Sequence, residues 1–125
     1  MSRVALVVDD SMLIRHTVCR FLEQRGFAVE SATNGQEALG ILETVLPDLI
    51  ITDLLMPKMD GHEFITRLKG MPQTTGIPIV VLAGKKVSDS QDETRANFVI
   101  YKDIEIESQL SKAIVSTLGD SVTDD

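Results

Sequence analysis

The chain has 125 residues, of which 43% are hydrophobic and 25% charged, as is typical of one soluble globular domain. Its net charge of -7 and isoelectric point near 4.7 argue against direct nucleic-acid binding, which depends on clustered lysines and arginines. The single cysteine, Cys19, excludes an internal disulfide, and the apolar run VALVV ends at two aspartates before it reaches signal-peptide length. We therefore expect a cytoplasmic protein without a membrane segment.

Strand and helix patterns alternate along the chain. Continuous apolar runs are typical of strands covered on both faces, and apolar residues at helical spacing predict amphipathic helices. In order, the patterns predict a strand at 4–8, a helix at 12–25, a strand at 27–32, a helix at 35–45, a strand at 49–52, a helix at 62–69, strands at 77–82 and 97–101, and a helix at 104–118. Gly26 closes the first helix, and Asn34 with Glu37 caps the second.

One helix is missing from the alternation. The segment KKVSDSQDETRA, residues 85–96, has Val87 as its only large apolar residue, so we expect a fourth helix there that is short or mobile. The whole pattern predicts an α/β fold, a doubly wound five-stranded parallel sheet of order 2-1-3-4-5 with flanking helices. We expect one domain at residues 1–119, followed by a polar tail or the start of a linker at 120–125.

Three aspartates lie at predicted strand ends. Asp9 and Asp10 follow the first strand and Asp53 ends the third, so in this strand order their carboxylates converge. Two such charges about 4 Å apart repel by about 4 kcal/mol at an effective dielectric near 20, and a cation or a proton must relieve this. Oxygen ligands favour Mg²⁺, with Mn²⁺ as the alternative, and the absence of a histidine and cysteine cluster disfavours zinc.

Four segments carry a resemblance to a known family. VVDDS, NGQEAL, DLLMPKMDG and IPIVVL resemble the acidic pair, the start of the second helix, the phosphoacceptor segment and the fourth strand of the CheY-like receiver domain of two-component response regulators. The resemblance spans the chain. It implies that Asp53 is the phosphoacceptor, that Asp10 binds the metal directly and Asp9 through water, and that the Leu55 carbonyl is a further ligand. Lys102 would contact the incoming phosphoryl group.

The chain departs from this family at the switch positions. Ala83 replaces a threonine or serine, and Val99 stands where an aromatic residue is usual, with Phe98 and Tyr101 on either side. The lost hydroxyl donor is worth about 1.5–3 kcal/mol, of about 5.5 kcal/mol needed to drive a two-state switch. Asp103 replaces the proline after Lys102, so we expect a trans peptide, which leaves the direction of that lysine undetermined.

Three functions follow from these observations. The first is a phosphorelay receiver that takes a phosphoryl group onto Asp53 from a histidine kinase or phosphotransfer protein, with Mg²⁺, and signals to an output protein or fused output domain. The second is a degenerate receiver that acts as a phosphorylation-independent interaction or dimerisation module. In the first function, Lys85 near the pocket is a candidate phosphoryl contact that would partly replace the missing hydroxyl, and the alternative is an ordinary solvated lysine. The third, a Mg²⁺-dependent phosphatase, is disfavoured because the first strand lacks a DxD spacing, so we do not expect an enzyme. Homodimer and monomer are both open.

Overall fold

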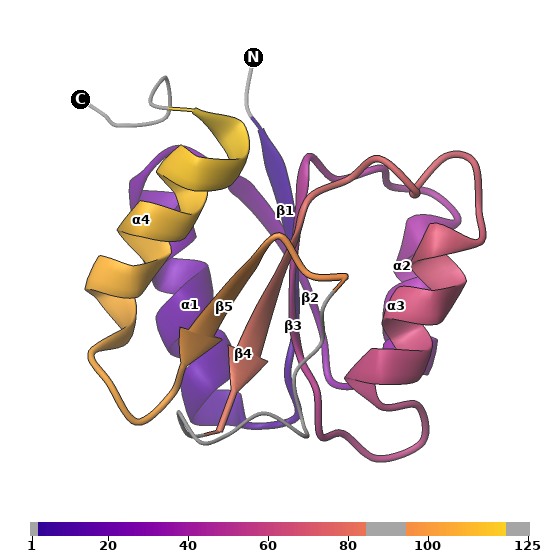
Figure 1. Ribbon diagram of the computed structural model, residues 1–125, viewed down its shortest axis with the longest axis horizontal. Helices are drawn as coiled ribbons and strands as arrows, with labels where there is room; N and C mark the ends of the chain where they lie inside the picture. The colour runs from indigo at the N-terminus through magenta and orange to yellow at the C-terminus, as the bar shows by residue number, and fades with distance from the viewer. Residues whose placement is uncertain (1–2, 85–94, 120–125) are drawn as a thin grey trace.

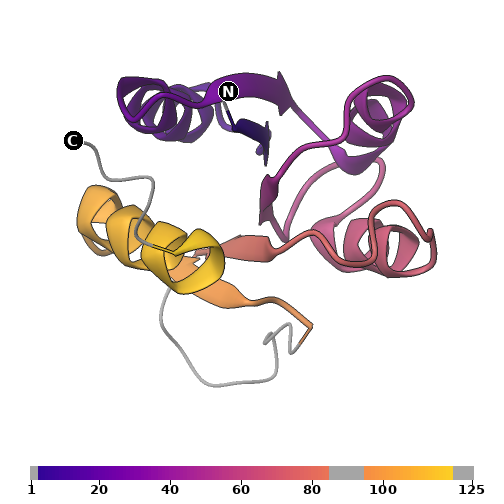
Figure 2. The same ribbon diagram turned by 90° about the horizontal axis from the view of Figure 1, so that it is seen from above.

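Five parallel strands form one sheet in the order β2-β1-β3-β4-β5. The structure is a computed structural model that describes residues 3–84 and 95–119. The strands are β1 (Val4–Val8), β2 (Ala28–Ala32), β3 (Leu49–Asp53), β4 (Ile79–Ala83) and β5 (Phe98–Tyr101), and the helices are α1 (Met12–Gln24), α2 (Gly35–Leu42), α3 (Gly61–Lys69) and α4 (Ile106–Leu118). Helices α1 and α4 cover one face of the sheet and α2 and α3 the other, as Figures 1 and 2 show. The predicted fold class and strand order are confirmed.

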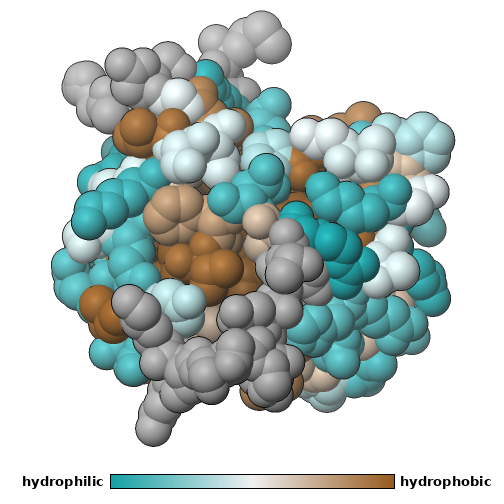
Figure 3. All heavy atoms as spheres, in the orientation of Figure 1, coloured by the Kyte–Doolittle hydropathy of each residue, from teal (hydrophilic) through white to brown (hydrophobic). Residues whose placement is uncertain are grey.

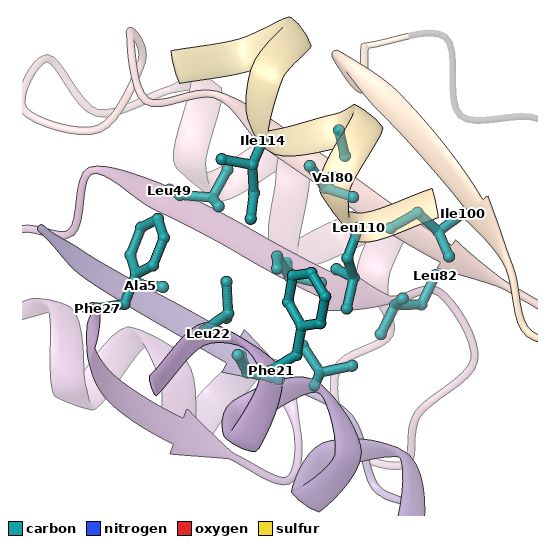
Figure 4. Packing of buried hydrophobic residues seen from close by; sticks show 14 residues of the cluster. Ala5, Phe21, Leu22, Phe27, Leu49, Val80, Leu82, Ile100, Leu110 and Ile114 are labelled. Atoms are coloured by element: carbon teal, nitrogen blue, oxygen red, sulfur yellow. The ribbon is translucent and has the colours of Figure 1, made fainter. Parts of the chain in front are cut away.

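The strands are apolar throughout because each supplies side chains to two cores. In β1, Ala5 and Val7 point toward α1 and α4, whereas Leu6 and Val8 point toward α2 and α3. Figure 4 shows the first core, where side chains of α1 and α4 meet those of the central strands. The labelled residues there are Ala5, Phe21, Leu22, Phe27, Leu49, Val80, Leu82, Ile100, Leu110 and Ile114. Two layers of buried contacts therefore hold the strand ends in fixed register.

Helices α2 and α4 are shorter than the sequence pattern predicts by two residues or more. Helix α2 ends at Leu42 and not at Val45, because the N–H groups of Glu43 and Thr44 bond carbonyls three residues back, which tightens the last turn. Helix α4 begins at Ile106 and not at residue 104, because the Ile104 N–H donates to the Tyr101 carbonyl and closes a turn after β5. The other boundaries differ from the predicted ones by at most two residues.

The predicted helix ends have the capping contacts that the sequence indicated. Asn34 Oδ1 accepts the N–H of Glu37 at 2.9 Å, and Glu37 Oε1 accepts the N–H of Thr33 at 2.6 Å. The N–H in the second bond belongs to Thr33, the residue before the N-cap Asn34. Gly26, with φ of 90°, follows α1 in the left-handed region that glycine tolerates.

Strand β5 lies at an edge of the sheet, and hydrophobic side chains gather over it in the space-filling view (Figure 3). The predicted short helix at 85–96 falls mostly, and the tail at 120–125 wholly, outside the described residues. Across residues 3–84 and 95–119, no helix combines the length and apolar character needed to span a membrane.

Candidate functional site

The three aspartates come together at the carboxyl ends of β1 and β3. These strands are neighbours, and Val8 pairs with Thr52, so the residues that follow each of them lie side by side. One carboxylate oxygen from each of Asp9, Asp10 and Asp53 lies within 4.8 Å of the other two. The predicted acidic cluster is therefore present in the folded chain.

Asp9 and Asp10 are adjacent in sequence but lie in different environments. Asp9 is buried, and its Oδ1 accepts the N–H of Ser11 at 2.8 Å, just before Ser11 caps α1. Its Oδ2 is also buried and lies 2.9 Å from Nζ of Lys102. Asp10 is exposed. One carboxylate is thus fixed by the fold, and its neighbour stands at the solvent side of the same cluster.

Asp53 is the last residue of β3 and is 6% exposed. Its Oδ1 accepts the N–H of Leu54 at 2.8 Å. Burial raises the pKa of Asp53 above the ordinary value, and the charge of Asp9 raises it further, while Lys102 opposes both effects. The carboxylate is therefore held in place but is less stable in its ionised form than an exposed aspartate.

Lys102 supplies the positive charge of the site. Its Nζ lies 2.9 Å from Asp9 Oδ2 and 3.0 Å from Asp53 Oδ2. Burial lowers the pKa of Lys102, but its close contacts with the two carboxylates outweigh this, so the pKa is raised overall. Among the described residues there is no cis peptide, so the Lys102–Asp103 bond is trans as expected, and the lysine still points at the carboxylates.

The loop after Asp53 folds tightly beneath the site. Lys58 has φ of 69°, and the Met59 side chain is buried in the core against α2. Asp60 caps α3 by accepting the N–H of Glu63. A Cβ on Gly61 would lie 2.2 Å from the Asp53 carbonyl oxygen, so only glycine fits there. The segment that follows Asp53 thus has structural reasons for its methionine, aspartate and glycine.

The remaining predicted site residues differ in their burial and contacts. Leu55, two residues after Asp53, is 72% exposed. Ala83 is partly buried at the end of β4, and its carbonyl accepts the N–H of Lys102 at 2.8 Å. Val99 packs partly buried against the core beside α2 and α3. Lys85 lies outside the described residues.

Sequence reasoning missed two residues that support the site. Arg15 on α1 donates from Nη1 to the Asp9 carbonyl at 2.9 Å. Gln109 on α4 bonds the backbone of Tyr101, the residue before Lys102. Both lie on helices among exposed polar positions, and neither has a local sequence signal, because each contact depends on how its helix packs on the sheet.

The donor set fits a small divalent cation. All of its ligand atoms are carboxylate oxygens, which Mg²⁺ and Mn²⁺ prefer. The three carboxylates exceed the single ammonium group by two negative charges. Lys102 Nζ contacts one oxygen each of Asp9 and Asp53, so one ammonium group is shared by the cluster and part of its negative charge is left for a cation. The residues present therefore match the predicted ion.

Comparison with known proteins identifies similar chains. The family model of the response regulator receiver domain matches residues 5–114. An uncharacterized 14.6 kDa protein of Leptolyngbya boryana is 39% identical over 97 residues, 77% of this chain and 74% of that protein. The phosphate regulon transcriptional regulatory protein PhoB of Escherichia coli is 38% identical over 95 residues, 76% of this chain but only 41% of PhoB.

Solved structures agree over nearly the whole chain. The receiver domain of a signal transduction histidine kinase from Syntrophus aciditrophicus matches with a TM-score of 0.81 and 33% identity, covering 98% of this chain and 96% of that one. The chemotaxis protein CheY4 of Vibrio cholerae matches with a TM-score of 0.84 and 29% identity, covering 94% and 100%.

Proposed function

The chain belongs to the family of response regulator receiver domains, and on that premise we propose that Asp53 accepts a phosphoryl group and that this changes the affinity of the protein for a partner. The observation that carries the proposal is the cluster itself: a buried carboxylate at the end of β3, within 4.8 Å of two further carboxylates and in contact with an ammonium group. Residues 1–119 would form the receiver, and residues 120–125 a tail or the start of a linker.

The transfer is a displacement at phosphorus. A carboxylate oxygen of Asp53 forms the new P–O bond while the bond from phosphorus to the donor breaks, and the donor's leaving group keeps the electron pair. The acceptor must be ionised to attack. The Leu54 N–H fixes one oxygen of Asp53, and the Lys102 ammonium lies beside the other, where negative charge from the arriving group would gather.

We assign the metal ligands to the same cluster. Asp10, Asp53 and the Leu55 carbonyl would bind Mg²⁺, or Mn²⁺, directly, and the buried Asp9 through water. When bound, the ion supplies charge neutralisation for the phosphoryl oxygens. Arg15, through the Asp9 carbonyl, and Ser11, through Asp9 Oδ1, hold the end of β1 in the position that this requires.

The donor would be the phosphohistidine of a histidine kinase or phosphotransfer protein, in the cytoplasm. One relative is named a transcriptional regulatory protein, and one structural neighbour is the receiver domain of a histidine kinase. We therefore propose that the output is a separate protein or a fused output domain. The net charge of -7 supports a protein partner over direct contact with nucleic acid.

A second candidate function rests on Ala83. This position at the end of β4 has no hydroxyl to bond a phosphoryl oxygen, and Val99 is packed into the core without an aromatic ring that could move. The chain would then be an interaction or dimerisation module whose binding does not depend on phosphorylation. Unchanged partner binding by Asp53→Asn under phosphorylating conditions would favour it.

The deciding experiment is intact-mass analysis after incubation with acetyl phosphate and Mg²⁺. The expected result is a single phosphoryl adduct on the native chain that is absent in Asp53→Asn and absent when EDTA replaces Mg²⁺. Asp60→Asn is the matched control, because Asp60 caps α3 outside the cluster. No adduct on the native chain would overturn the proposal and leave the interaction module.

A further inference from the structure

We propose that Gln109 is a positioning residue that aims Lys102 at the carboxylates, a role that rests on the proposed function. Gln109 is half-buried on α4, and the hydrogen bonds of its side chain to the described residues go to backbone atoms and not to the carboxylates of the cluster. Its side-chain amide instead holds the backbone on both sides of Lys102.

Two of the Gln109 hydrogen bonds are made to strand β5. The Tyr101 N–H donates to Gln109 Oε1 at 2.9 Å, and Gln109 Nε2 donates to the Tyr101 carbonyl at 2.9 Å. Strand β5 is an edge strand, and β4 pairs only with its other side. The amide of Gln109 therefore bonds Tyr101 as a neighbouring strand would, with one donor and one acceptor.

The other contacts of the Gln109 amide are made to the turn that follows β5. Gln109 Nε2 has two N–H groups, and beside the Tyr101 carbonyl it lies 3.3 Å and 3.1 Å from the carbonyls of Ile104 and Glu105, which share the second N–H. The Ile104 N–H closes the same turn on the Tyr101 carbonyl at 3.2 Å. One amide thus ties together the last residue of the strand and the first residues before α4.

Lys102 lies between these two attachments. Its own N–H donates to the Ala83 carbonyl at 2.8 Å, on the β4 side of the strand, while Tyr101 is held on the opposite side by Gln109. With its backbone fixed from both edges, the side chain of Lys102 leaves the strand in a set direction and reaches Asp9 and Asp53.

The residue after the lysine explains why such a hold is needed. Proline at that position would restrict its own φ and the conformation of the preceding residue. Asp103 imposes neither restriction, and its peptide with Lys102 is trans. Hydrogen bonds from Gln109 therefore supply the restriction on the Lys102 backbone that the local sequence does not.

The test is a double-mutant cycle between Gln109→Met and Lys102→Met. Methionine keeps the length of the side chain but removes the amide. The quantity measured is the initial rate of Asp53 phosphorylation by acetyl phosphate with Mg²⁺. Because misplacing a catalytic group by about 1 Å can cost up to about a hundredfold, we expect Gln109→Met to lower the rate by about tenfold in the native background. In the Lys102→Met background it should lower the rate no further.

Two further variants complete the design. Gln36→Met makes the same change at an exposed position on α2 and should leave the rate unchanged. Gln109→Glu keeps the acceptor for the Tyr101 N–H but loses the amide donor. Its phosphorylation rate should therefore lie between those of the native chain and Gln109→Met. An equal loss of rate in both lysine backgrounds, or no loss in either, would overturn the proposal in favour of a stabilising contact alone.

A readout without phosphorylation separates this proposal from the proposed function. In the metal-free native chain, the side-chain ε-CH₂ signal of Lys102 in ¹H–¹³C NMR should shift when Asp53 is changed to asparagine, because Nζ lies 3.0 Å from that carboxylate. In Gln109→Met, or in Gln109→Glu if the first variant does not fold, the response should be smaller. If the native chain forms no phosphoryl adduct, the proposed function fails, but this NMR shift still tests the role of Gln109. A shift as large in the Gln109 variant as in the native chain would refute that role.

Discussion

Nζ of Lys102 lies 3.0 Å from Oδ2 of Asp53, although these residues come from β5 and β3, which are not neighbours in the sheet. The lysine reaches past the end of β4, and that strand ends in alanine. Ala83 thus ends the intervening strand without a hydroxyl donor beside these two groups.

Removing the lysine should destabilise the chain and make its stability depend on the metal. Lys102→Met leaves the fully buried Asp9 carboxylate without its cation, and breaking a buried pair costs about 3–5 kcal/mol. Thermal unfolding in EDTA should show a lower Tm, and saturating Mg²⁺ should recover part of the loss by binding the folded state. Lys112→Met, exposed on α4, is the control. A Tm that does not respond to Mg²⁺ would argue against metal binding at this cluster.

Neutralising the acceptor should stabilise the metal-free chain at neutral pH. The pKa of Asp53 is raised in the folded state, so the stability that this group contributes is present below its ordinary pKa of 3.8 and is lost as pH rises through the raised value. Asp53→Asn carries no charge at any pH and should raise Tm at pH 7 in EDTA, with a gain that shrinks toward pH 4. Glu30→Gln, exposed on β2, should show no such trend. A gain that grows as pH falls would contradict the sign of the pKa shift.

Adding one carbon at Gly61 should disturb the acceptor itself. The new Cβ would lie 2.2 Å from the Asp53 carbonyl oxygen and 2.7 Å from the Leu54 Cα, so the backbone of β3 has to move. Gly61→Ala should lower the free energy of unfolding by about 1–3 kcal/mol and slow phosphorylation. Gly40→Ala is the matched control, because its Cβ meets nothing within 4 Å on α2, and it should stabilise the chain by about 0.5–1 kcal/mol. Denaturant unfolding of both variants measures the contrast.

Restoring the hydroxyl at the end of β4 should extend the response to phosphorylation. In the native chain, amide shifts caused by beryllofluoride, a phosphoryl mimic, should stay close to Asp53. Ala83→Thr adds a donor worth about 1.5–3 kcal/mol to a charged group, and the shifts should then spread into β5. Ala83→Val has the same shape without the hydroxyl and should behave as the native chain does. Widespread shifts in the native chain would show that its switch works without this donor.

The thiol of Cys19 should react slowly. Burial raises its pKa, the charge of Glu23 raises it further, and Arg15 opposes the shift only partly. The thiolate is the reactive form, so alkylation by iodoacetamide at pH 8 should be slower than in the urea-unfolded chain and should accelerate as pH rises. Mass spectrometry of the quenched samples gives the rate. Equal rates in the folded and unfolded chains would contradict the shift.

The sequence by itself determined the sheet and the acidic cluster at its edge. Two-sided burial makes parallel strands continuously apolar, so β1, β3 and β4 were visible as runs of valine and isoleucine. The pattern also indicated the three aspartates of the cluster, because they follow or end such runs. The strand order then brings their carboxylates together, at Asp9, Asp10 and Asp53. These features are local in sequence, which is why pattern alone predicted them.

Helix ends and the direction of Lys102 were decided only by the tertiary structure. The end of α2 and the start of α4 depend on individual hydrogen bonds that competing local patterns do not distinguish. Nothing beside Lys102 in the sequence fixes its direction. That direction comes from Gln109, seven residues later, and from Ala83 on the neighbouring strand. Such contacts form only when a helix and a strand pack together, because hydrogen bonds between elements depend on distances that no local residue pattern encodes.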